Sequence, residues 1–276
     1  MLIDAHCHLD FDELADYRAR AGIRSGGADV EVSASGKGST NTSLDTLIER
    51  TPDAYVVPSI GKSNWRRVSE LAAANANVRA AYGIHPWWAD QHDAADIKAL
   101  AEWLERDDCV ALGEVGLDVN IELSVEQQRA RLKPQLELAV ELGKPALLHS
   151  VKTHEDMLRL LKETGLKRGM IHAFSGSYEQ GEQFIKHGFM LGIGGIITYD
   201  RASKTRDAVA RLPIEALLLE SDAPSMPVCG HQGEVNTPER LMITARSLAE
   251  LRGCPVEDVI AQTSANAERL FGAFLI

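Results

Sequence analysis

The chain has 276 residues, of which 45% are hydrophobic and 25% are charged, so a sizeable globular core is available. Its 29 lysines and arginines against 40 aspartates and glutamates give a net charge of −11, which argues against a broad grip on duplex DNA but leaves room for a phosphate held locally by metal ions. The four cysteines are scattered and no apolar run approaches the roughly 18 residues of a membrane span, which predicts a cytoplasmic protein with reduced thiols and no membrane contact.

Short runs of aliphatic and β-branched residues recur along the chain and predict eight strands. In chain order these runs are 2–6, 55–60, 78–84, 110–116, 145–150, 169–174, 189–195 and 216–222. Stretches with helical periodicity lie between them, the clearest at 124–143, 153–165, 177–188 and 237–253, and a further helix is expected at 255–272. The first of these stretches places Ser124 three residues before Gln127, the spacing of a capping box, and ends on Gly143.

Strand followed by helix, eight times, predicts a parallel sheet. Eight strands in a chain of this length favour a closed (β/α)8 TIM barrel over an open doubly wound sheet, with a single domain over residues 1–276 and an extra C-terminal helix. One segment, 22–41, does not fit the pattern because it is dense in glycine and serine. We interpret it as a surface insertion that emerges at the carboxyl end of the barrel, with a lid over the substrate as the alternative.

The first predicted strand leads into IDAHCHLD, where two histidines are separated by a single residue. In a strand, residues i and i+2 point to the same side, so His6 and His8 would face one way and Cys7 the other. Two neutral imidazoles on one face can chelate a metal ion. This tripeptide alone is a weak signal, and the remaining ligands have to come from elsewhere in the chain.

Further imidazoles and carboxylates end or follow other predicted strands: His85 the third, Glu114 the fourth, His149 the fifth, His172 the sixth and Asp222 the eighth. In a barrel the carboxyl ends of the strands meet at one mouth, where active sites are built. Imidazoles and carboxylates without thiolates suit zinc, manganese, magnesium or related divalent ions at an open catalytic site. Four of these histidines with the two carboxylates already exceed what one ion needs, whereas two divalent metal ions bridged by one carboxylate would account for those six.

Seven sequence blocks carry a resemblance to a known family: IDAHCHLD, YGIHP, GEVGLD, LLHS, IHAFSG, LESDAPSMP and NTPERL. In this order they are similar to the TatD family of metal-dependent nucleases, within the amidohydrolase-type barrels. The resemblance runs from residue 1 to the C-terminal helix, except for the Gly/Ser-rich segment. It implies a TIM barrel with two divalent metals that hydrolyses phosphodiester bonds of DNA, often from the 3′ end of single strands. We therefore expect a 3′–5′ exonuclease acting on single-stranded DNA, and we infer no protein partner.

The resemblance also implies a ligand set for the two metal ions, one position at a time. The first ion would be held by His6, His8, Glu114 and Asp222. The second ion would share Glu114, which bridges the pair, and would be held also by His149 and His172. The blocks that contain these residues are the ones on which the resemblance depends, so the ligand set and the family assignment come from the same positions.

Other roles follow from the same resemblance. Glu114 and Asp222 would be the catalytic carboxylates, with Asp222 accepting a proton from water and later helping to protonate the leaving group. His85 matches a position that binds the substrate rather than a metal ion. Asp118 and Glu220 match supporting positions, for which a structural hydrogen bond is the alternative.

The chain departs from the family pattern near the expected mouth. The family often has an arginine two residues after the histidine of the fifth strand, and this chain has Val151 there, followed by Lys152. An arginine could hold a phosphate through two hydrogen bonds, and a valine cannot. Trp87 and Trp88 follow His85 and could stack a base, with packing of the loop as the alternative.

Three functions are compatible with these residues. The first is a two-metal phosphodiesterase that acts on DNA. The second is a metal-dependent ester or amide hydrolase with the same centre, such as an enzyme that removes D-amino acids from tRNA, although no extended basic surface favours tRNA. The third is a non-enzymatic metal-binding or interaction protein. This third function is disfavoured because a storage or scaffold role has no need for open coordination positions.

Overall fold

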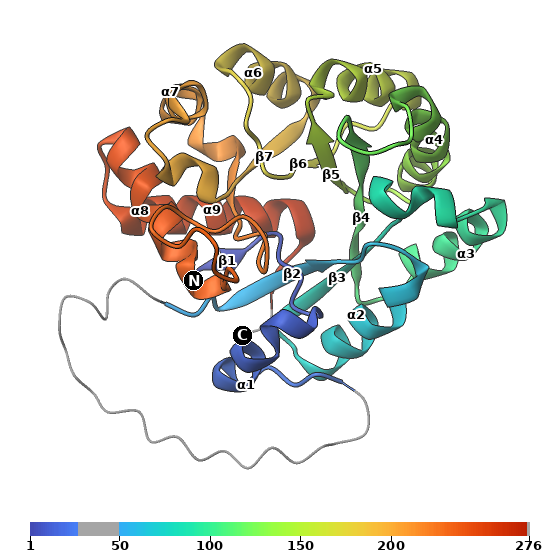
Figure 1. Cartoon of the computed structure of the whole chain (residues 1–276), viewed down its shortest axis with the longest axis horizontal. Coiled ribbons are helices and arrows are strands. Elements are labelled where there is room, and N and C mark those ends of the chain that lie inside the picture. Colours follow the sequence, from blue (N-terminus) through green and yellow to red (C-terminus); the bar gives the residue numbers. More distant parts are fainter. Residues whose placement is uncertain (27–49, 275–276) are drawn as a thin grey trace.

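Eight parallel strands form a nearly closed barrel, with helices arranged around its outside (Figure 1). The computed structural model describes residues 1–26 and 50–274, so the expected insertion at 22–41 lies outside the described residues from position 27 onward. The strands pair in chain order from β1 to β8, which confirms the expected (β/α)8 TIM barrel. Backbone hydrogen bonds complete the ring, from Ala5 N–H to the Leu219 carbonyl at 2.9 Å and from Asp222 N–H to the His6 carbonyl at 3.0 Å.

The strands of the barrel are β1 (Ile3–Asp4), β2 (Ala54–Pro58), β3 (Val78–Tyr82), β4 (Cys109–Asp118), β5 (Ala146–Val151), β6 (Gly169–Ile171), β7 (Phe189–Ile193) and β8 (Leu217–Leu219). The helices are α1 (Ala15–Ala21), α2 (Lys62–Ala74), α3 (Ala94–Leu104), α4 (Val125–Glu141), α5 (His154–Thr164), α6 (Tyr178–His187), α7 (Ser203–Arg211), α8 (Leu241–Arg252) and α9 (Val256–Phe271). Within the described part of the chain, no helix combines the length and the apolar composition that a membrane crossing requires.

The expected helix boundaries hold where the sequence contains capping residues. In α4, Ser124 Oγ accepts a hydrogen bond from Gln127 N–H at 3.3 Å, while Gln127 Oε1 accepts one from Ser124 N–H at 3.0 Å. Gly143, just beyond α4, has a left-handed φ of 63°, as its position after a helix end predicts. The expected helix at 237–253 differs at its start, because a 3-10 turn, η6 (Pro238–Arg240), precedes α8.

The expected strand at 216–222 is shorter in the structure, because the ladder ends where the chain bends toward the mouth. Ser221 donates its N–H to Asp4 Oδ1 at 2.9 Å, and its hydroxyl is 2.6 Å from Asp4 Oδ2. The next residue, Asp222, has a φ of 53°, in the left-handed region that non-glycine residues rarely adopt. The bend turns the Asp222 carboxylate away from the strand direction and toward the centre of the mouth.

Helix α9 closes the amino-terminal end of the barrel rather than joining the outer ring. Ala267, Leu270 and Phe271 on this helix belong to the apolar cluster that fills the barrel interior. The strand residues of this cluster are Ile3, Ala5, Ala54, Val56, Ala81, Ala111, Leu147, Met170 and Leu218. Asn266 Nδ2 donates to the carbonyl of Leu217, the first residue of β8, at 2.8 Å. One end of the barrel is therefore packed shut, and the other is free to form a site.

Candidate metal centre

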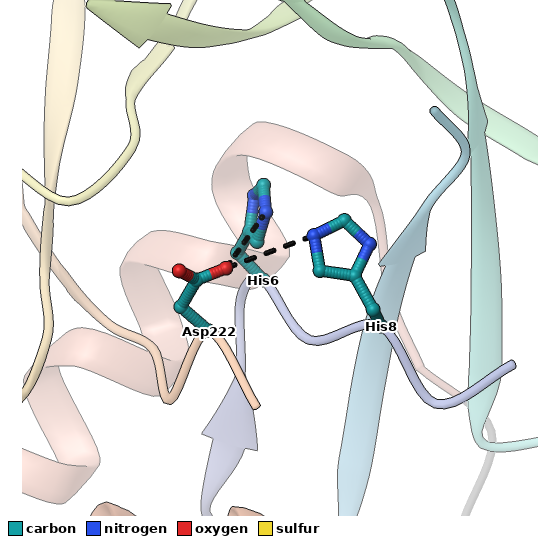
Figure 2. A group of neighbouring side chains, drawn as sticks. All are labelled: His6, His8 and Asp222. Atoms are coloured by element: carbon teal, nitrogen blue, oxygen red, sulfur yellow. Dashed lines mark ion pairs between the residues drawn. The ribbon is translucent and has the colours of Figure 1, made fainter. Parts of the chain in front are cut away.

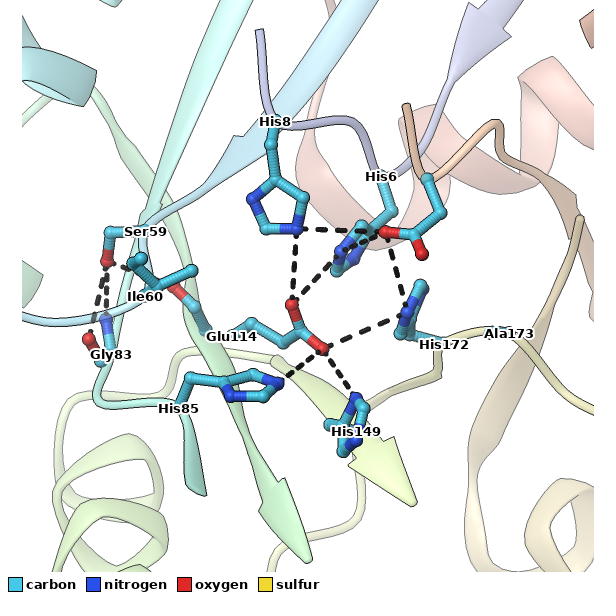
Figure 3. A network of polar contacts seen from close by, with 12 residues as sticks. His6, His8, Ser59, Ile60, Gly83, His85, Glu114, His149, His172 and Ala173 are labelled. Atoms are coloured by element: carbon cyan, nitrogen blue, oxygen red, sulfur yellow. Dashed lines mark hydrogen bonds and ion pairs between the residues drawn. The ribbon is translucent and has the colours of Figure 1, made fainter. Parts of the chain in front are cut away.

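Five histidines and two carboxylates converge at the carboxyl end of the barrel, around the Glu114 side chain (Figure 3). Each comes from the end of a strand or from the segment that follows it: His6 and His8 after β1, His85 after β3, Glu114 on β4, His149 on β5, His172 after β6 and Asp222 after β8. Apart from His149, which is partly buried, all of them are buried. The structure thus brings every sequence-predicted site residue into one cluster.

Glu114 divides the cluster between its two carboxylate oxygens. Its Oε2 atom lies 3.3 Å from His6 Nε2 and 3.5 Å from His8 Nε2. Its Oε1 atom lies 2.9 Å from His149 Nδ1 and 3.8 Å from His172 Nε2. One carboxylate therefore faces two separate groups of nitrogens, which is the arrangement that a bridging ligand needs.

His6 and His8 reach this carboxylate in a way that differs from the expectation. Because β1 ends at Asp4, both histidines lie beyond the strand, and their rings are almost perpendicular at 84°, with centroids 5.2 Å apart. Their Nε2 atoms nevertheless converge on Glu114. Cys7, between them, is fully buried in the core, as expected.

Asp222 closes the other side of the cluster (Figure 2). Its Oδ1 atom lies 3.6 Å from His6 Nε2 and 3.7 Å from His8 Nε2, and it is also 3.7 Å from His172 Nε2. These distances leave the facing atoms of His6, His8 and Asp222 within 4.8 Å of one another, close enough to hold one metal ion. The left-handed conformation of Asp222 costs free energy, and the hydrogen bonds on Ser221 and on the Asp222 N–H hold it in place.

Two histidines carry a carboxylate on the nitrogen that faces away from the cluster. His149 Nε2 lies 3.1 Å from Asp118 Oδ2, and His172 Nδ1 lies 3.0 Å from Glu220 Oε1. Carboxylates in this position keep the proton on the outer nitrogen and leave the inner nitrogen free for a metal. The geometry of His149 and His172 is therefore that of metal ligands.

His85 has the opposite arrangement. Its Nδ1 atom accepts a hydrogen bond from the Trp87 backbone N–H at 3.2 Å, so in a neutral ring the proton lies on Nε2. That Nε2 atom faces Glu114 Oε1 at 3.4 Å. His85, Glu114 and His149 have facing atoms within 4.8 Å of one another, so His85 lies at ligand distance although its tautomer presents a donor. The sequence did not predict this closeness to Glu114.

The ionisation of the cluster reflects its packing. Burial and the neighbouring His172 lower the pKa of His6, and burial lowers the pKa of His85. Burial would raise the pKa of Glu114, but the nearby histidines outweigh it and hold that pKa well below its usual range. Burial opposes protonation of His149 too, yet hydrogen bonds with Asp118 and Glu114 raise its pKa to about 9.

The nitrogens of the cluster also test whether a metal fits. His6 Nε2, which faces Glu114 and Asp222, is buried and makes no hydrogen bond with the described residues. Buried polar atoms without partners are rare in proteins and call for a ligand. Imidazole nitrogens beside carboxylates are a donor set for divalent transition metals, so the residues present fit such ions.

Around the cluster lies a mouth of about 110 Å³. Phe11 and Ser225, which the sequence did not single out, line it together with Ile60, Trp87 and Trp88. Val151 ends β5 two residues after His149 and is partly buried, and the next residue, Lys152, is exposed with a left-handed φ of 56°. No sequence signal pointed to Phe11 or Ser225, because each reaches the mouth through a loop.

A parallel barrel with histidines and carboxylates gathered at the carboxyl ends of its strands defines a class: the metal-dependent hydrolases built on the TIM barrel. A family model for TatD related DNase matches residues 3–272. The chain belongs to the TatD family, as the sequence blocks had indicated.

Individual relatives agree with this assignment. The chain is 37% identical over 273 residues to the uncharacterized metal-dependent hydrolase YjjV of Escherichia coli K12, which covers 98% of this chain and 97% of that protein. The crystal structure of YjjV, a TatD homolog, superposes with a TM-score of 0.84 at 35% identity, covering 99% of this chain and 98% of that one. The chain is also 32% identical over 241 residues to the 3′-5′ ssDNA/RNA exonuclease TatD of Erwinia amylovora, covering 83% of this chain and 93% of that protein.

Proposed function

We propose that this protein is a deoxyribonuclease that uses two metal ions to hydrolyse phosphodiester bonds of single-stranded DNA from the 3′ end. The observation that carries the proposal is that the two carboxylate oxygens of Glu114 face different histidines. One oxygen faces His6 and His8, and the other faces His149. A single mononuclear site has no need for such a bridge. The relative from Erwinia amylovora, named as a 3′-5′ ssDNA/RNA exonuclease, supports the choice of substrate.

The two ions would be held as the family pattern implies: the first by His6, His8, Glu114 and Asp222, the second by Glu114, His149 and His172. Support comes from the unpartnered Nε2 atom of His6 and from the carboxylates behind His149 and His172. When bound, divalent ions at this position would polarise a phosphoryl oxygen and make water a better nucleophile at neutral pH. Zinc, magnesium and manganese are the candidates.

The side chains around the two ions would have separate roles in the reaction. Asp222 presents Oδ1 to three histidine nitrogens, so we assign its Oδ2 atom as the acceptor of the proton from the attacking water. His85 carries its proton on Nε2 at the mouth and would donate a hydrogen bond to the substrate phosphate rather than bind a metal. Asp118 and Glu220 orient His149 and His172.

The attraction for DNA would be concentrated at the centre of the mouth. The chain has a net charge of −11, so long-range attraction of a polyanion is weak. The ions and the His85 donor would supply most of the attraction for a phosphate. A strand end that reaches into the mouth suits this arrangement better than a long duplex lying across the surface.

The test compares substrates on the metal-loaded protein. The protein is loaded with zinc, magnesium or manganese and incubated with four substrates. These are single-stranded DNA labelled at either end, duplex DNA of the same sequence, single-stranded RNA and D-aminoacyl-tRNA. We expect mononucleotides to be released from the 3′ end of single strands, and a chelator to abolish the release. The variant Val140→Ala, on the exposed face of α4, serves as the matched control and should cleave normally.

One specific observation favours a second candidate, an ester hydrolase such as a D-aminoacyl-tRNA deacylase. Val151 occupies the position where an arginine would grip a phosphate, so the mouth lacks that anchor. Release of D-amino acids from tRNA, with intact DNA in the parallel reaction, would overturn the nuclease proposal in favour of this candidate.

A further inference from the structure

Trp87 stands at the rim of the mouth with an exposed ring. It is the second residue of η3 (Pro86–Gln91), directly beyond His85, and 55% of its surface is accessible. Its ring meets the His85 ring edge-on, with centroids 5.4 Å apart and an interplanar angle of 87°. An exposed aromatic ring beside a candidate active site offers a flat apolar face on which part of a ligand could stack.

The ring is held in place although it is exposed. Its Nε1–H donates to Asp118 Oδ2 at 2.9 Å, and the same oxygen lies 3.1 Å from His149 Nε2. The Asn120 backbone N–H holds the other oxygen of Asp118 at 2.8 Å. Trp87 thus shares its anchor with a candidate metal ligand, and a ring fixed in advance loses little entropy when a ligand stacks on it.

Two valines lie next to Asp118, the residue that anchors the ring. Val119 directly follows Asp118, is 42% exposed and donates its N–H to the Val151 carbonyl at 3.3 Å. Val151 lies two residues after His149 on β5, and by strand alternation its side chain is on the same side as that histidine. Val151 is also the residue of β5 that pairs in register with Asp118, so an apolar side chain lies beside the carboxylate that anchors the ring.

The size of the mouth separates the reacting group from the rest of the substrate. Its volume of about 110 Å³ is well below the roughly 300–1,000 Å³ of pockets that enclose a whole small ligand. A phosphate group fits such a space, but a complete nucleotide does not. The base that belongs to that phosphate must lie outside, on the rim.

We propose that Trp87, anchored on Asp118 next to the strand position of Val151, forms a subsite that stacks the nucleobase of the nucleotide whose phosphate is in the mouth. This inference rests on the proposed nuclease function and specifies which part of the substrate the rim recognises. Any base can stack on an aromatic face, so the subsite should favour a nucleotide that carries a base over one that lacks it. It should not discriminate among the four bases. Asp118 is the positioning residue, because it fixes both the ring and His149.

A phosphate is the wrong occupant for this rim. Asp118 Oδ2 lies at the indole edge of Trp87, 2.9 Å from Nε1, and an aspartate carboxyl group is ordinarily ionised at neutral pH. A second anion at the rim would be repelled by it. A neutral, flat, apolar ring has no such penalty and covers the exposed face of Trp87.

The experiment combines two ligands with four proteins. Binding of dAMP and of deoxyribose 5-phosphate, which differ only in the base, is measured by tryptophan fluorescence and by calorimetry on the metal-loaded protein. Neither ligand contains a phosphodiester, so the measurement does not depend on turnover. The proteins are the unmodified chain, Trp87→Ala, Trp87→Phe and the control Trp103→Phe. Trp103 lies on α3, outside the lining of the mouth, and its ring packs against Tyr82 of β3.

We expect the unmodified chain and Trp103→Phe to bind dAMP at least tenfold more tightly than deoxyribose 5-phosphate, with quenching of fluorescence by dAMP alone. Trp87→Ala should lose most of that preference, because stacking of one base contributes on the order of tenfold in affinity. Trp87→Phe, which keeps a ring but not the N–H, should retain part of it. An equal loss for both ligands in Trp87→Ala would overturn the proposal and make Trp87 a structural residue.

The outcomes also separate this inference from the proposed function. Cleavage of DNA with no preference for dAMP over the base-free ligand would overturn the subsite while leaving the nuclease function in place. A Trp87-dependent preference for dAMP, in a protein that cleaves no nucleic acid, would support the ring subsite and reject the phosphodiesterase. Abasic oligonucleotides provide a check on turnover, since the proposal expects their cleavage to be slower and insensitive to Trp87→Ala.

Discussion

The two ends of the barrel are built from the same strands but have opposite chemistry. On β5, Leu147 belongs to the apolar interior and His149, two residues later, to the metal cluster. On β6, Met170 belongs to that interior, and His172 follows the strand with the same spacing. At the amino-terminal end, Phe271 and its neighbours on α9 seal the barrel. At the carboxyl end no helix covers the strands in the described residues, and ionisable groups gather there.

This difference separates stability from function within one set of strands. Apolar residues at the amino-terminal end lower the free energy of the folded state and contact no reacting group. The carboxyl end does the reverse, because it buries ionisable side chains and holds Asp222 in a left-handed conformation. Such features cost stability and persist where function requires them. Substitutions at the two ends should therefore have opposite signatures.

The largest effect is expected at the sealed end. Phe271→Ala removes a buried aromatic ring from α9 and should lower the free energy of unfolding by about 3–5 kcal/mol. Turnover per folded molecule should not change, because Phe271 is remote from the mouth. Urea denaturation measures the free energy of unfolding, and an activity assay at a urea concentration well below the unfolding transition measures the turnover. Val140→Ala, at a side chain that is 43% exposed, is the control and should shift stability by less than about 0.5 kcal/mol. Loss of activity without loss of stability would contradict the comparison.

Asp222→Asn should show the opposite signature at the mouth. The amide keeps the shape and much of the ligand capacity but cannot accept a proton, so turnover should fall by about 100-fold or more while metal remains partly bound. The urea midpoint should change far less than in Phe271→Ala. Turnover is measured under saturating substrate, with metal content determined on the same sample. Near-normal turnover at full metal content would show that another residue accepts the proton.

Sequence patterns predicted the barrel well because its determinants are local. Apolar runs, the capping box of Ser124 and Gln127, and glycines after helix ends are each readable within a few residues. Strand ends were less accurate. The predicted strand 216–222 extends past β8 because no local pattern shows that Ser221 bonds to Asp4, a partner 217 positions away.

The candidate site could be predicted as a set of residues but not as a geometry. The placement of histidines and carboxylates at strand ends indicated which side chains meet. The division of Glu114 between two groups, and the anchoring of Trp87 on Asp118 across 31 residues, depend on the closed barrel. The left-handed conformation of Asp222 was not foreseeable either, because aspartate has no strong preference for it.

The contrast between His149 and His85 sharpens the description of the open end. The outer nitrogen of His149 faces a carboxylate, whereas the outer nitrogen of His85 accepts a hydrogen bond from a backbone N–H. The inner nitrogen is therefore available to a metal ion in His149 and carries the proton in His85, so only His149 should act as a ligand. His149→Asn should weaken the binding of one ion by about 100-fold, the upper part of the range seen for residues that support metal sites. His85→Asn should keep both ions and raise KM. Metal content after dialysis at a fixed ion concentration distinguishes the two, and loss of an ion from His85→Asn would make His85 a ligand.

The smallest effect is expected at the rim, where Val151 stands in place of an arginine. Val151→Arg should add a phosphate contact and tighten binding of single-stranded DNA by roughly 1–3 kcal/mol, the scale of a charge-assisted hydrogen bond. A plot of the logarithm of affinity against the logarithm of salt concentration should become steeper by the amount expected for about one additional phosphate contact. An abasic strand should gain as much as a normal one, because the new contact is with phosphate. Affinity is measured at two salt concentrations for both proteins, with Val151→Ala as the control for loss of the valine. If DNA affinity stays flat while activity on an ester substrate falls, Val151 fits an apolar part of a different substrate, and the ester hydrolase becomes the better assignment.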